Sequence, residues 1–140
     1  MPQPNSTETT LRYLRLIHGF LLFSMFIYMG LGQIFVPHEQ RAIKPAFMIV
    51  MVVVSLATAC VVLFIRAQRI LPAMETLRAR PDDGPAISRW RIGSVFSYAL
   101  SESVMLYGFA LRVMGASLAL AVPFYIGAVL LMVLLWPRRP

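Results

Sequence analysis

Four long stretches of the chain are almost free of charged side chains. Three of them contain no Asp, Glu, Lys or Arg, and the stretch from 92 to 111 contains only Glu102. Each is about 20 residues long, enough for a helix to cross the ~30 Å hydrocarbon layer. Backbone amides in lipid must be paired within their own segment, and the alternating pattern of barrel strands is missing, so helices are expected. The predicted fold is all-α, a bundle of four transmembrane helices with spans at 14–36, 46–65, 92–112 and 117–136.

The composition agrees with a lipid environment. Hydrophobic residues make up 59% of the 140 residues and charged residues 14%, and the mean hydropathy is +0.72. A chain of this length cannot bury so much apolar surface in one soluble core. We therefore expect residues 11–140 to form a membrane domain with the lipid bilayer as its main partner.

The basic residues are distributed unevenly between the two predicted sides of the membrane. Of 13 Lys and Arg residues, all but Arg41, Lys44 and Arg112 fall near the termini or between 66 and 91. Basic segments near a span stay in the cytoplasm. We expect both termini and the basic loop 66–91 to be cytoplasmic in a cell membrane, most simply a bacterial inner membrane, with Arg112 extending to the outer headgroups. The net charge of +7 then indicates binding of anionic lipid at the loop, and no nucleic-acid module is recognisable.

The basic loop allows two local structures. Ile70, Leu71, Met74 and Leu77 fall near one helical face, which is typical of a helix lying on the membrane surface. Alternatively, the second helix continues into the cytoplasm and is kinked at Pro72. Residues 1–10, which are polar, are expected to form an N-terminal tail.

Glu102 is the one carboxylate within a predicted span. At helical rise it lies roughly 15 Å from either membrane face. An ionised side chain at that depth costs about 2.5–3.5 kcal/mol on insertion scales, and desolvation favours its neutral form. Intramembrane ionisable residues commonly mark proton or ion pathways. We therefore predict that Glu102 binds a proton or a small cation; the alternative is a hydrogen bond that only pairs two helices.

Small and hydroxyl-bearing residues surround Glu102 on the same predicted helix. Tyr98 and Ser101 lie near its face at helical spacing, and we include both in the predicted site. Gly93, Ser97 and Ser101 form a small-residue row of the kind that lets helices approach closely. We expect this row to contact a second copy of the chain or a partner membrane subunit.

The stretch "ALSESVMLYGF", residues 99–109, resembles the carboxylate-bearing helix of the proteolipid c subunit of rotary ATP synthases. The matching positions are Ala99, Leu100, Glu102, Ser103, Tyr107 and Gly108. The resemblance implies that Glu102 carries the proton or sodium ion and that Ser103 and Tyr107 shape its site. The rest of the chain matches less well, because the second span lacks the repeated glycines of the family's ring-lining helix.

Two classes of function follow from these patterns. The first is a membrane protein that handles ions through Glu102, and the second is a structural or accessory subunit of a larger membrane complex. No nucleophile with a base, phosphate-binding glycine loop or metal cluster is recognisable, so we expect no enzyme activity, no cofactor and no metal site. The single cysteine, Cys60, is expected to be a small packing residue.

Overall fold

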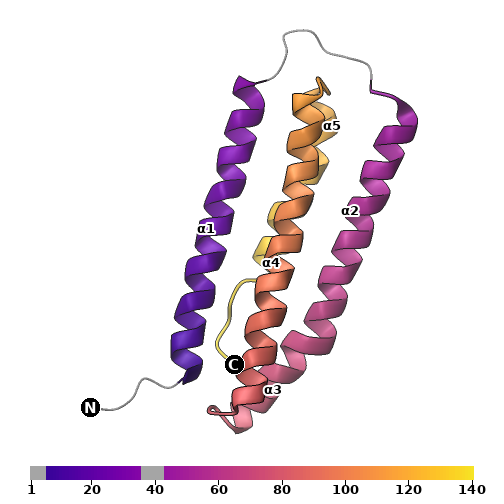
Figure 1. The fold of residues 1–140 in the computed structure, drawn as a ribbon. Coiled ribbons are helices and arrows are strands. Elements are labelled where there is room, and N and C mark those ends of the chain that lie inside the picture. The colour runs from indigo at the N-terminus through magenta and orange to yellow at the C-terminus, as the bar shows by residue number, and fades with distance from the viewer. Residues whose placement is uncertain (1–5, 36–42) are drawn as a thin grey trace.

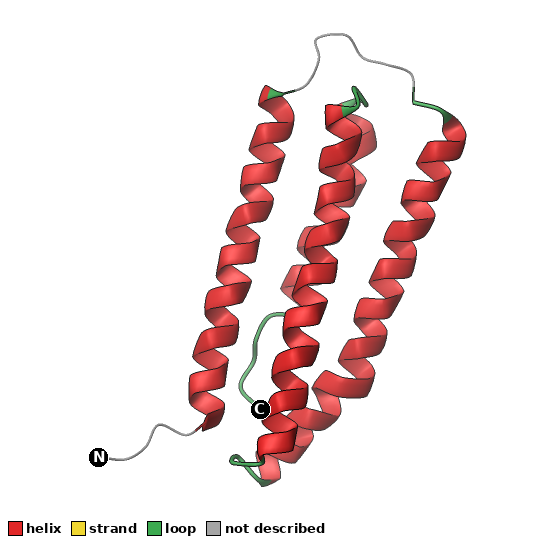
Figure 2. Cartoon of the chain, viewed as in Figure 1, coloured by secondary structure: helices red, strands yellow, loops and turns green. Residues whose placement is uncertain are grey.

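The structure describes residues 6–35 and 43–140 of a computed structural model, and most of these residues are helical (Figure 2). No strand occurs in these two ranges, which confirms the predicted all-α class. The helices are α1 (Ser6–Ile34), α2 (Pro45–Ile65), the π-helical segment η1 (Arg66–Ile70), α3 (Leu71–Ala79), α4 (Gly84–Val113) and α5 (Leu118–Leu134). Two continuous stretches, Thr7–Ile34 and Pro45–Ala79, are long and apolar enough to cross a membrane.

Helix α4 lies at the centre of the bundle. It packs against α1, α2, α3 and α5, and α1 also contacts α5. In Figure 1, α1 and α2 flank the pair formed by α4 and α5. Gly115 has a φ of 92°, a left-handed conformation that glycine adopts without strain, and it provides the tight turn from α4 into α5. Helix α4 therefore contacts each of the other helices that the structure describes.

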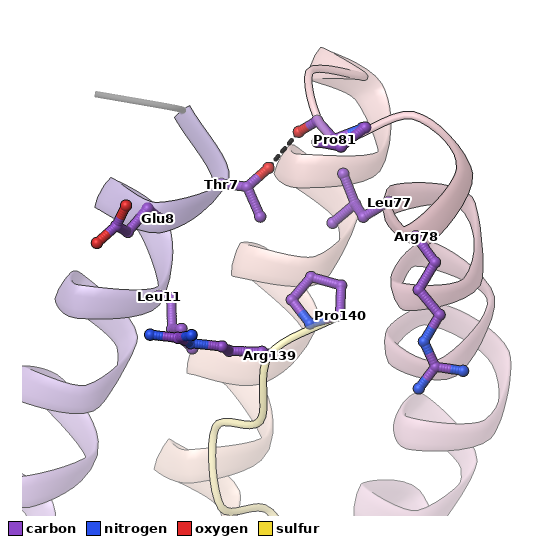
Figure 3. Close-up of a pocket in the computed structure, with 8 residues that line it drawn as sticks. All are labelled: Thr7, Glu8, Leu11, Leu77, Arg78, Pro81, Arg139 and Pro140. Carbon is purple, nitrogen blue, oxygen red and sulfur yellow. Dashed lines mark hydrogen bonds between the residues drawn. The ribbon is translucent and has the colours of Figure 1, made fainter. Parts of the chain in front are cut away.

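The first helix begins earlier than the sequence pattern predicts. Residues 6–10, which we expected in a polar tail, form the first turns of α1. The Arg12 guanidinium donates a hydrogen bond to Glu8 over 2.9 Å, the Thr7 hydroxyl donates to the Pro81 carbonyl (Figure 3), and Leu11 is buried. These contacts stabilise polar residues in helical form, so the tail prediction is wrong for residues 6–10. Residues 1–5 and the predicted end of the first span at position 36 lie outside the described residues.

The predicted basic loop 66–91 is also helical for most of its length. Helix α2 continues through η1 and α3 to Ala79, and α4 begins at Gly84, which leaves only a short turn between them. Pro72 is the second residue of α3 and has no backbone N–H to donate within this continuous helix. The N–H of Leu71 donates a hydrogen bond to the carbonyl of Arg66, five residues earlier. This wider π-helical turn accommodates the proline, so the helix continues from α2 into α3.

The apolar face of this region explains why it is not a loop. Ile70, Ala73 and Leu77 are buried, and both η1 and α3 pack against α4. At the start of α4, the side chain of Asp83 accepts a hydrogen bond from the Ala86 N–H over 2.8 Å, an N-cap that begins the helix well before position 92. Of the two structures that the sequence allows, continuation of the second helix is the one observed.

Candidate functional site

The Glu102 carboxylate lies between α4 and α1. The Ser24 hydroxyl of α1 is 2.5 Å from Oε1 of Glu102 and donates a hydrogen bond to it. Both side chains are partly buried. Ser24 Oγ also lies 2.8 Å from the carbonyl oxygen of Leu21, one turn earlier on its own helix. The carboxyl group therefore faces a hydroxyl that has two acceptors within reach.

This geometry suits both protonation states of the carboxyl group. A serine hydroxyl has one hydrogen to donate and lone pairs to accept. When Glu102 is ionised, Ser24 can direct its hydrogen to Oε1, as in the observed bond. When Glu102 is protonated, Ser24 can turn its hydrogen to the Leu21 carbonyl and accept the carboxylic proton instead. The contact between Ser24 and Glu102 is therefore compatible with either group supplying the hydrogen.

No cation neutralises Glu102 among the described residues. The one ion pair within residues 6–35 and 43–140 joins Arg12 to Glu8, at the end of the bundle that holds the N-terminal residues of α1. The 2.5 Å separation between Oγ of Ser24 and Oε1 of Glu102 is at the short end of the range for hydrogen bonds between two oxygens. The hydroxyl of Ser24 is therefore the main polar contact of the carboxyl group.

Tyr98 lies one turn before Glu102 and is almost completely buried. Its ring meets the imidazole of His18 edge to face, with centroids 5.0 Å apart and planes at 76°. Trp136 meets the other side of His18 at 5.1 Å and 78°. Neither nitrogen of this buried imidazole has a hydrogen-bond partner in the described part of the protein. The α1–α4 interface therefore holds a second ionisable side chain near the C-terminal segment.

At the other end of the same interface, Arg112 turns inward. It is 7% exposed, and its guanidinium donates to the Ala116 carbonyl over 2.6 Å and to Oε1 of Gln33 over 3.2 Å. The expectation that Arg112 extends to the outer headgroups is wrong. Its side chain instead closes the α4–α5 turn and ties that turn to α1, because carbonyl and amide oxygens supply acceptors that apolar surroundings lack.

The remaining predicted site residues do not gather around Glu102. Ser101 and Ser103 donate to carbonyls of their own helix, those of Ser97 at 2.8 Å and Leu100 at 2.7 Å. Tyr107 packs in a separate apolar cluster with Leu111. Five residues of helix place Tyr107 about 140° away from Glu102 around α4.

The sequence-based site missed Ser24. It is the only Ser or Thr between 14 and 36, and it lies near the middle of that predicted span, as Glu102 does in its own. Comparing how deep the polar residues lie within each predicted span would have identified Ser24 as a possible partner of Glu102. The resemblance around Glu102 instead led to neighbours on the same helix as the predicted site residues.

The small-residue row of α4 has its contacts within the chain. Ser97 and Ser101 are fully buried. A Cβ at Gly93 would lie 3.1 Å from Cγ1 of Ile70 and 3.5 Å from Cβ of Arg69, so η1 covers this position. A second copy or a partner subunit would have to contact another face of the molecule.

Among the described residues, no group of three or more His, Cys, Asp and Glu side chains is arranged to hold a metal ion. Cys60 is exposed on α2. Comparison of the chain with protein-family models, curated proteins and solved structures gives no match. The Ser24–Glu102 pair is the candidate site, because its hydrogen bond joins two helices through a partly buried carboxyl group.

Proposed function

We propose that this chain is a four-span protein of the cell membrane with both termini in the cytoplasm. Support comes from the two long apolar stretches and from α4 and α5, which run beside them (Figure 1). Around α2, large apolar side chains such as Ile49, Leu56 and Phe64 are more than 60% exposed. Such a surface suits acyl chains as its surroundings. The excess of basic residues near the start of α1, between 66 and 91 and in the C-terminal segment supports the orientation.

We also propose that the protein handles protons or small cations through Glu102, without enzyme activity. The observation that carries this proposal is the 2.5 Å contact from Ser24 to a carboxyl group that has no cationic partner in the described residues. Repacking of α1 against α4 would change the contact and hence the affinity for the ion. This chemistry is similar to that of the c subunit, with Ser24 of a facing helix in the supporting role that the resemblance assigned to Ser103 and Tyr107.

Reconstituted vesicles provide the test. We expect Glu102→Gln to abolish a proton or sodium flux that the unmodified protein catalyses, because Gln keeps the shape but has no titratable proton. Ser103→Ala is the matched control, since that hydroxyl bonds only to its own helix. Labelling of Glu102 by a hydrophobic carbodiimide at neutral pH, with protection by sodium if that is the ion, supplies an independent readout. Equal flux in Glu102→Gln and unmodified protein would contradict the proposal.

A structural or accessory subunit is the second candidate. The hydrogen bond of Glu102 joins α1 to α4, and helix pairing alone would account for it. The exposed apolar side chains of α1 and α2 could contact other subunits of a larger complex. Purification in mild detergent separates the candidates: a stoichiometric heterologous complex, with no flux from the isolated protein, would favour this role.

A further inference from the structure

An apolar groove of about 570 Å³ runs along the bundle between α2 and α5. Its walls include Leu56 and Ala59 of α2 and Gly127 and Leu130 of α5, and Val104 of α4 lines it between them. The groove stays open because small residues form parts of both walls. In particular, a Cβ at Gly127 would meet no atom within 4 Å. Its volume lies within the range of about 300–1,000 Å³ that is common for ligand sites.

The lining offers nothing polar to an occupant. Ser55 is the one lining residue with a polar side chain, and its hydroxyl donates to the Met51 carbonyl of its own helix over 2.8 Å. The occupant must therefore be apolar along this length, since an unpaired polar group would lose its hydrogen bonds to water.

A cationic group stands at one end of the groove. Arg66 follows the last lining residue of α2, Leu63, by one turn, and its guanidinium donates to the carbonyl of Leu134, which also lines the groove, over 2.9 Å. This bond holds the charge beside the opening. Arg138 lines a small adjoining cavity together with Arg66. An anionic group would find complementary charge there.

The length of the groove matches one leaflet of a bilayer. From Val52 to Leu63, α2 rises about 17 Å, and half of the hydrocarbon layer is about 15 Å thick. A molecule that is apolar over this length and anionic at its end has the form of a membrane phospholipid.

We propose that this groove binds one acyl chain of an anionic phospholipid, with the lipid phosphate against Arg66. The site lies on the α2–α5 side of the bundle, and the proposal is independent of any role of Glu102. A lipid bound there would contact both α2 and α5, and so stabilise α2 against the rest of the bundle.

Native mass spectrometry of the full chain, with phosphatidylglycerol or phosphatidylcholine of identical acyl chains, tests this proposal. We expect one retained phosphatidylglycerol per chain and weaker retention of phosphatidylcholine. Arg66→Gln should lower the affinity for phosphatidylglycerol by about fivefold and that for phosphatidylcholine by less, because the choline cation of phosphatidylcholine offsets the charge of its phosphate. Arg91→Gln, an exposed arginine that does not line the groove, is the charge control and should change neither.

Filling the groove should remove the lipid. We expect Gly127→Leu to lose the retained phosphatidylglycerol, whereas Gly30→Leu, at another glycine with open space around it and away from the groove, retains it. If Gly127→Leu does not fold, Ala59→Leu on the opposite wall replaces it. Equal retention in the groove-filling and control variants, equal retention of the two lipids, or a dimer in which a second copy occupies the groove would overturn the proposal.

Discussion

The hydrogen bond between Ser24 and Glu102 leads to a quantitative prediction for the stability of the bundle. Ser24→Ala removes the hydrogen-bond donor. Glu102→Leu removes the acceptor with little change in side-chain volume. The two residues lie 78 positions apart in the chain, and the 2.5 Å bond joins α1 to α4. If the bond forms in solution, the two substitutions must interact energetically.

The expected coupling follows from the environment of the bond. Interhelical hydrogen bonds in membrane proteins average about 0.6 kcal/mol, with a maximum near 1.7 kcal/mol, because the unfolded chain in detergent or lipid also finds partners. The contact is short and its acceptor is a carboxyl group, so we expect a value in the upper half of that range, about 1–1.7 kcal/mol.

A double-mutant cycle measures this coupling. The free energy of unfolding of the purified protein is determined by denaturant titration in mixed micelles for the parent, both single variants and the double variant. Ser55→Ala is the matched control, because the Ser55 hydroxyl bonds only to the Met51 carbonyl of its own helix. Its cycle with Glu102→Leu should be additive within about 0.5 kcal/mol. Additivity in the Ser24 cycle as well would refute the contact.

Three further predictions concern the fold. Gly108→Ala should destabilise the protein by about 1–3 kcal/mol, because the new Cβ would lie 2.7 Å from an aromatic ring of α5; Gly127→Ala, with open space around it, should not destabilise it. Asp83→Ala should cost about 0.5–2 kcal/mol through loss of the N-cap of α4. Leu77→Ala, at a position only 2% exposed, should cost about 2–5 kcal/mol, whereas Leu71→Ala at 45% exposure should change stability by about 0.5 kcal/mol or less. Unfolding in mixed micelles, followed by circular dichroism, measures each change; similar losses at the buried and exposed leucines would contradict the packing of α3.

The element types were predictable because they depend on local pattern. Charge-free runs such as 46–65 are helical, and α2 spans Pro45–Ile65. The ends of the helices were less predictable, because they depend on contacts between distant segments. Residues 6–10 are polar, yet Thr7 reaches the Pro81 carbonyl and Leu11 is buried, so the helix extends through them.

For the candidate site, too, one part was predictable from the sequence and another part was not. The burial cost of a carboxylate in a long apolar run is a property of the sequence, and this cost is enough to single out Glu102. The partner of that carboxylate is a property of helix packing. Tyr107, close in the chain, faces another cluster, whereas Ser24, far away in the chain, donates the hydrogen bond.

The sequence by itself determined that the chain is helical, rich in lipid-compatible surface and provided with one carboxyl group in an apolar segment, because hydropathy and charge act over a few turns of one helix. The tertiary structure alone decided which helices meet. It placed α4 at the centre, turned Arg112 inward and left a groove beside Arg66, because these outcomes depend on the rotation of each helix about its axis and on the fit of side chains between helices.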